Sequence, residues 1–182
     1  MPEITLSTLS LILGAGALGG GVWGLTQEAT VRELLKGYPR NNNVGYATIL
    51  AGMVWFLYIL GGESMSDFEQ FRTIFNVLLI GTGVGACVYL KDYLAVRGTA
   101  VLMILVAKLI VDTARWHDSE WRLVLVVMAY IMVIKGMWLT VSPWKMRDLI
   151  QWILSGDKRF KNVCIARIVF GALLLGLGLA VF

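Results

Sequence analysis

The chain has 182 residues, of which 58% are hydrophobic, and its formal net charge is +4. Its mean hydropathy is +0.73, and a soluble domain is only about 45–50% apolar. Six membrane-spanning helices of about 20 residues would use roughly 120 residues, which leaves little chain for a soluble domain. The composition therefore excludes a soluble globular protein, and we expect a single membrane domain over residues 1–182.

Long apolar runs follow one another along the chain, separated by short charged connections. A helical residue rises about 1.5 Å and the hydrocarbon core of a bilayer is about 30 Å thick, so a run of about 20 apolar residues crosses the membrane. We therefore expect an all-α polytopic membrane protein with six transmembrane helices. The expected spans are Ile4–Leu25, Val44–Gly62, Phe71–Leu90, Tyr93–Ala114, Trp121–Val141 and Asn162–Phe182.

Lysine and arginine gather in alternate connections between the expected spans. The connections after the first, third and fifth spans are basic, whereas the opposite connections carry only Arg72, Arg115 and Arg122 beside acidic residues. Because Lys and Arg resist translocation, their excess marks the cytoplasmic side. We therefore expect both ends of the chain outside, and the positive charge indicates topology and no nucleic-acid partner.

Two of the basic connections have the periodicity of amphipathic helices. In Thr26–Gly37 and in Ser142–Ser155, apolar residues recur with the i, i+3, i+4, i+7 spacing. We expect two helices in the cytoplasmic interface, with their basic sides toward anionic headgroups. A compatible alternative is that they cover the floor of the bundle. The candidate anionic-lipid contacts are Arg32, Lys36, Lys145 and Arg147.

The beginning and the end of the chain resemble each other. Residues 31–35 (VRELL) align without gaps on residues 146–150 (MRDLI), with Trp23 and Trp138 upstream. This pattern favours a parallel internal repeat, although chance similarity between apolar stretches is the alternative. We therefore expect three hairpins, over residues of about 4–62, 71–114 and 121–182.

The last hairpin contains a Lys-Gly pair, a proline, a short basic segment and a span that opens with Arg and Gly. These residues are Lys135, Gly136, Pro143, Lys145, Arg147, Arg167 and Gly171. Over about Val126–Phe182 this order resembles the YjeT-like two-helix inner-membrane proteins of bacteria, a family of unknown function in which an acidic residue stands where this chain has Lys135. The resemblance implies a bacterial inner membrane and no activity. The whole chain also resembles uncharacterised polytopic membrane proteins.

Small residues recur at four-residue spacing on several spans. They let helix backbones approach closely, which matters in lipid because no hydrophobic force drives helices together. We expect them to pack helices within the chain, with contact to a partner or a second copy as the alternative. The candidate helix-packing glycines are Gly16, Gly20, Gly24, Gly81, Gly85, Gly171 and Gly176.

Charged residues inside the expected spans are the sharpest functional candidates. A Lys at the bilayer centre costs about 2.5–3.5 kcal/mol, and such residues often mark a function. Lys108 and Asp112 are four residues apart on the fourth span and are expected to pair on one helix face. Lys135 is about two turns from the inner end of the fifth span, within snorkelling reach. A structural role is our interpretation, and a substrate or ion site is the alternative.

The sequence contains none of the short motifs that mark catalytic or metal sites, such as HExxH, a P-loop, GxSxG or Cys-x-x-Cys. Cys87 and Cys164 fall in apolar runs and are expected to be reduced. The single His117 leaves a bis-histidine haem dependent on a second chain. We therefore expect no cofactor and no enzyme. The leading hypothesis is a membrane scaffold or accessory subunit that contacts anionic lipids and either other membrane subunits or its own copies. The alternative is a small transporter or channel.

Overall fold

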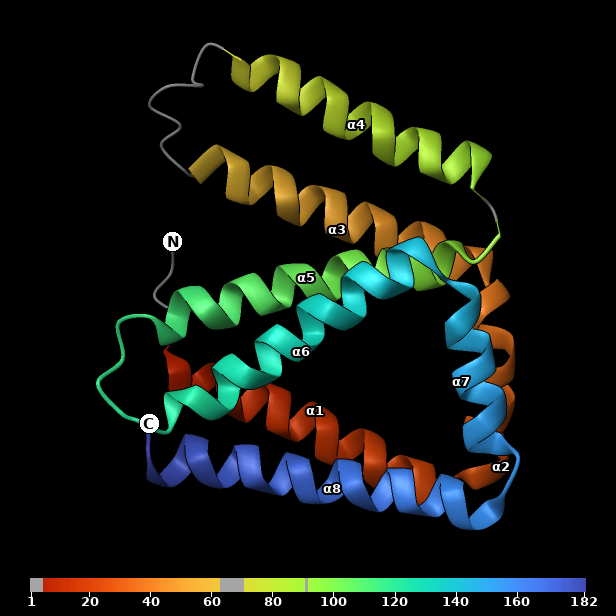
Figure 1. The fold of residues 1–182 in the computed structure, drawn as a ribbon, viewed down its shortest axis with the longest axis vertical. Coiled ribbons are helices and arrows are strands. Elements are labelled where there is room, and N and C mark those ends of the chain that lie inside the picture. Colours follow the sequence, from red (N-terminus) through yellow and green to blue (C-terminus); the bar gives the residue numbers. More distant parts are fainter. Residues whose placement is uncertain (1–4, 63–70, 91) are drawn as a thin grey trace.

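The computed structural model describes residues 5–62, 71–90 and 92–182. Within these ranges all regular structure is helical, and Figure 1 shows long helices with two short ones lying across one end. A single turn of 3-10 helix, η1 (Tyr38–Arg40), follows the first short helix. The α-helices are α1 (Leu6–Thr26), α2 (Glu28–Gly37), α3 (Asn42–Gly62), α4 (Arg72–Tyr89), α5 (Leu94–Ala114), α6 (Arg122–Val141), α7 (Trp144–Leu154) and α8 (Asp157–Ala180).

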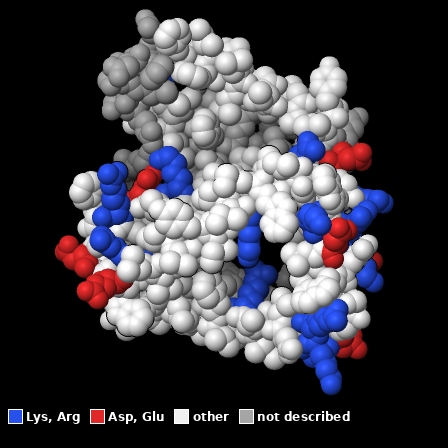
Figure 2. Space-filling view, in the orientation of Figure 1, with Lys and Arg blue, Asp and Glu red and all other residues white. Residues whose placement is uncertain are grey.

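Six of the described helices, α1, α3, α4, α5, α6 and α8, are long and apolar enough to cross a membrane. They contain 18 to 24 residues, which corresponds to about 27–36 Å of helix. The prediction of an all-α polytopic membrane protein is therefore confirmed. In Figure 2 the charged side chains gather at the two ends of the bundle and the surface between them is mostly uncharged, as a protein crossing a hydrocarbon layer requires.

Helix ends differ from the predicted spans where polar residues extend a helix past its apolar run. α3 begins at Asn42 rather than at Val44, because the side-chain oxygen of Asn41 accepts a hydrogen bond from the backbone N–H of Val44 (3.3 Å). α8 begins at Asp157, five residues before the predicted start at Asn162. Hydropathy located the spans, and for α3 the cap at Asn41 decided where the helix begins.

The long helices pack in an order that differs from their order along the chain. α1 packs along α8 and runs antiparallel to it, while α5 packs against both α3 and α6 (Figure 1). The main apolar core joins α1, α5, α6 and α8 at the end of the bundle remote from α7. Its buried residues are Leu6, Leu9, Ala107, Ile110, Ala114, Leu125, Ala129 and Leu174.

The two helices of each outer hairpin are connected but do not pack along each other. α2 links α1 to α3 and α7 links α6 to α8, and these short helices contact one another at the same end of the bundle (Figure 1). α7 contains 11 residues, or about 16 Å of helix, whereas packed helices lie about 8–10 Å apart. A helix laid across the ends in this way holds its two neighbours apart.

Two serine hydroxyls of α1 form hydrogen bonds with backbone carbonyls of α8. The buried hydroxyl of Ser10 donates to the carbonyl of Leu174 (2.7 Å), and the Ser7 hydroxyl donates to the carbonyl of Gly178 (2.7 Å). These bonds satisfy polar groups that would be costly to bury alone. Because the two hydroxyls are one helical turn apart, they also determine the register of the two helices.

Candidate functional site

The predicted packing glycines separate into two groups in the structure. A methyl group built on Gly171 would lie 2.5 Å from the backbone nitrogen of Leu18, and one on Gly24 would lie 2.7 Å from the sulfur of Cys164. Gly20 faces the guanidinium of Arg167. The other four have no described atom within 4 Å of such a methyl group, so they do not pack helices within the described chain. They are Gly16, Gly81, Gly85 and Gly176.

Close packing also uses glycines that the four-residue spacing did not select. A methyl group on Gly14 would lie 2.9 Å from the backbone nitrogen of Leu175, and one on Gly21 would lie 2.6 Å from Ile168. The residues of α1 that face α8 follow spacings of 3, 4, 7 and 3 along the sequence. They are Ser7, Ser10, Gly14, Gly21 and Gly24. This heptad-like pattern of small residues was present in the sequence and would have identified the correct face.

Arg32 joins α2 to the junction between α7 and α8. Its guanidinium contacts Glu28 (2.7 Å) on its own helix and Asp157 (2.8 Å) at the start of α8, and it donates to the carbonyl of Leu154 (3.2 Å). Its charge also lies 4.6 Å from the centre of the buried Phe160 ring. With only 19% of the side chain exposed, Arg32 has protein partners where the sequence suggested a lipid headgroup.

The other candidate lipid contacts remain on the surface at this end of the bundle. Lys36 and Lys145 are exposed. Arg147 donates to Asp148 (3.0 Å) and to the hydroxyl of Tyr93 (3.4 Å). The hydrogen bond with Asp148 raises the pKa of the Arg147 guanidinium. These side chains are accessible from outside the protein, and Arg147 is paired with Asp148.

Lys108 and Asp112 form the ion pair that their spacing predicted. The ammonium nitrogen of Lys108 lies 2.7 Å from a carboxylate oxygen of Asp112, and the two side chains are 39% and 57% exposed. The pair lies in the last two turns of α5, at the end of the bundle away from α7 (Figure 1). Its exposure makes it a surface pair and leaves no charge buried at the middle of the helix.

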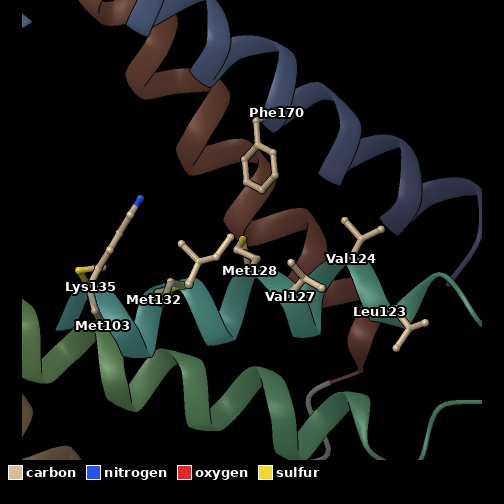
Figure 3. Close-up of a pocket in the computed structure, with 9 residues that line it drawn as sticks. Met103, Leu123, Val124, Val127, Met128, Met132, Lys135 and Phe170 are labelled. Carbon is tan, nitrogen blue, oxygen red and sulfur yellow. The ribbon is translucent and has the colours of Figure 1, made fainter. Parts of the chain in front are cut away.

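Lys135 lies at one end of an apolar groove beside α6. Its neighbour Gly136 packs against α5, where an added methyl group would lie 3.0 Å from the carbonyl of Ala100. This register turns Lys135 away from α5, and Figure 3 shows its side chain extending from α6 toward the α8 side. We call this space, of about 600 Å³, the α6/α8 groove. Residues that line it include Met103, Leu123, Met128, Ile131, Lys135 and Phe170.

Arg167 of α8 is a second cation on the side of the helix that faces the α6/α8 groove. It precedes Phe170 by three residues, so the two side chains share a helix face, and Phe170 lines the groove. Its guanidinium lies against Gly20 of α1, where an added methyl group would come within 2.8 Å of it. In Figure 2, Lys and Arg atoms border a hollow in the middle of the face, away from both charged ends. Arg167 was not among the residues predicted as charges inside a span, which are Lys108, Asp112 and Lys135.

No group of three or more His, Cys, Asp or Glu side chains that could hold a metal ion lies among the described residues. Cys87 and Cys164 are free thiols, and Cys164 is buried against α1. The His117 ring packs edge-on against Phe182, 5.2 Å between centres. Comparisons of this chain with protein-family models, with curated proteins and with solved structures found no match.

Proposed function

We propose that this protein is a non-enzymatic membrane scaffold or accessory subunit that works by associating with other transmembrane helices. The observation that carries the proposal is the position of α4. Among the described helices it packs against α3 and none of its residues is buried, whereas nine residues of α5 are. A span held so weakly by its own chain is available to another one.

The contact between α4 and α3 is itself loose. Gly83 of α4 lies against the sulfur of Met53, where an added methyl group would be 2.8 Å away, and a cavity of about 320 Å³ lies beside this contact. The opposite face of α4 presents glycines and valines to the outside. It consists of Val77, Gly81, Val84, Gly85 and Val88. Such a flat face permits close approach of a second helix.

The test is extraction of the tagged protein from native membranes into polymer-bounded lipid discs, followed by identification of stoichiometric partners and of the copy number. Gly81→Leu with Gly85→Leu should remove the partner, because two large side chains would interrupt the flat face of α4. Gly176→Leu places the same side chain at an open position of α8 and serves as the matched control. A protein that is a single copy without partners in such discs would contradict the proposal.

A small transporter or channel is the second candidate, and the α6/α8 groove favours it. A groove with a cation at one end is a feature of solute sites inside membranes. Transporters commonly place broken helices at such sites, yet α6 and α8 run as unbroken helices beside it. Solute flux in liposomes containing the purified protein, lost on Lys135→Gln, would favour this candidate over the scaffold.

We also propose a bacterial inner membrane as the location, with the α2 and α7 end in the cytoplasm and both chain ends outside. The basic residues at this end support the orientation. The shared order of long, short and long helix in α1–α2–α3 and α6–α7–α8 supports the internal repeat, and the resemblance of the last hairpin to YjeT-like proteins supports the bacterial membrane. The proposal includes no cofactor.

A further inference from the structure

We propose that the α6/α8 groove is a binding site for an anionic phospholipid. The phosphate would lie between Lys135 and Arg167, and an acyl chain would extend along the apolar lining toward Leu123. This inference is independent of whether α4 binds a partner.

The charges at the groove are unmatched by the protein. Neither Lys135 nor Arg167 forms an ion pair or a hydrogen bond with the part of the chain that the structure describes. An unpaired cation away from water is costly, and it is stabilised by a negative group that arrives with its own apolar body. A phospholipid with net negative charge has this composition, and the membrane supplies it at high concentration.

The two cations lie inside their helices, on the side of the bundle that α7 closes. Lys135 is six residues, or about 9 Å, from the end of α6 at Val141, and Arg167 is ten residues, or about 15 Å, from the start of α8 at Asp157. Long basic side chains snorkel over several ångströms toward the interface, so both can reach one headgroup near the α7 end.

The groove also has the length of an acyl chain in one leaflet. Along α6 its lining extends from Leu123 to Lys135, twelve residues or about 18 Å of helix. One leaflet contributes about half of a 30 Å hydrocarbon core, or about 15 Å. Lys135 lies at the α7 end of this lining and the remaining lining is apolar, so the polarity of the groove matches a lipid with its head at that end.

The structure also explains why a neighbouring helix of the same chain does not fill the groove. α7 separates the end of α6 from the start of α8, and α8 is engaged by α1 along its other side. A partner helix entering the groove would meet two cations and would need an acidic residue at that depth. Phospholipid meets the same requirement without a second protein.

Native mass spectrometry of the delipidated protein, titrated with phosphatidylglycerol or phosphatidylcholine of equal chain length, tests the inference. Wild type should retain phosphatidylglycerol preferentially. Lys135→Gln with Arg167→Gln should weaken that binding at least tenfold and leave phosphatidylcholine binding unchanged. Lys158→Gln with Lys161→Gln removes the same charge from the exposed start of α8 and should keep the preference.

The inference is overturned if the Lys135/Arg167 variant keeps the preference, if the control pair loses it equally, or if millimolar inorganic phosphate displaces the lipid. Ile131→Trp provides a second measurement that leaves both cations in place. It fills the groove and should also weaken phosphatidylglycerol binding at least tenfold, whereas Ile134→Trp, at a residue of α6 that does not line the groove, should not. Wild-type binding by Ile131→Trp would overturn the proposed path of the acyl chain.

Discussion

Replacing Gly171 by alanine should separate α1 from α8, and Gly176→Ala on the same helix provides its control. The added methyl group of Gly171→Ala would lie 2.5 Å from the backbone nitrogen of Leu18 and 2.8 Å from the carbonyl of Gly14. Both are backbone atoms, so a side-chain rotation cannot relieve the clash. Gly176→Ala meets no described atom within 4 Å.

The difference between these two variants isolates the cost of the close contact. Each replaces a helical glycine by alanine and gains about 1 kcal/mol of helix propensity, so this gain cancels in the comparison. Overpacking costs about 1–3 kcal/mol, and separation of the helices also weakens the Ser10 hydrogen bond to Leu174 (2.7 Å), a bond worth about 1 kcal/mol. Gly171→Ala should therefore be less stable than Gly176→Ala by about 2–4 kcal/mol.

Reversible unfolding in mixed micelles, followed by the circular dichroism of the helices, measures this difference. Gly176→Ala should unfold at the wild-type denaturant fraction or above it, and Gly171→Ala clearly below it. Equal stability of the two variants would show that α1 and α8 do not meet at Gly171 and would refute the argument from backbone contact.

Three further predictions concern Arg32, Asp112 and the orientation of the chain in the membrane. Arg32→Gln should cost about 1.5–3 kcal/mol, since charged hydrogen bonds to Glu28, Asp157 and Leu154 are lost, while Lys36→Gln on the exposed side of α2 should stay within about 0.5 kcal/mol in the same unfolding assay. Asp112→Asn should cost only about 0.3–0.5 kcal/mol, because the pair with Lys108 is exposed; a loss above 2 kcal/mol would contradict this. In intact cells of a variant without native cysteines, a cysteine at Asn42 should resist an impermeant thiol reagent and one at Ser119 should react; the reverse labelling would invert the proposed orientation.

Hydropathy was sufficient to find the membrane spans because it is a local property of the chain. Each apolar run must satisfy its own backbone hydrogen bonds in lipid, so its length and composition already require a helix. The amphipathic segments that form α2 and α7 could also be predicted, since their apolar residues recur with the helical period. For the same reason the Lys108–Asp112 contact could be predicted, because both residues belong to one helix.

Contacts between helices could not be predicted in this way. Gly16 and Gly14 lie two residues apart on α1, yet only Gly14 meets α8, because the crossing of two helices depends on which faces the rest of the bundle leaves free. Likewise, Arg32 contacts Asp157 and Leu154 from a distant part of the chain, and no local pattern identifies these two partners. The four-residue glycine spacing identified small residues on a helix but did not identify the helix against which they pack.

The sequence by itself determined that this chain is a helical membrane protein, which segments cross the bilayer and which connections form short amphipathic helices. Only the tertiary structure decided that α1 pairs with α8, that α4 remains at the edge, and that α7 holds α6 and α8 apart around Lys135 and Arg167. The physical reason is the range of the forces involved. Backbone hydrogen bonding and hydropathy act within a segment, whereas close packing depends on residues far apart in the chain that meet only in the folded bundle.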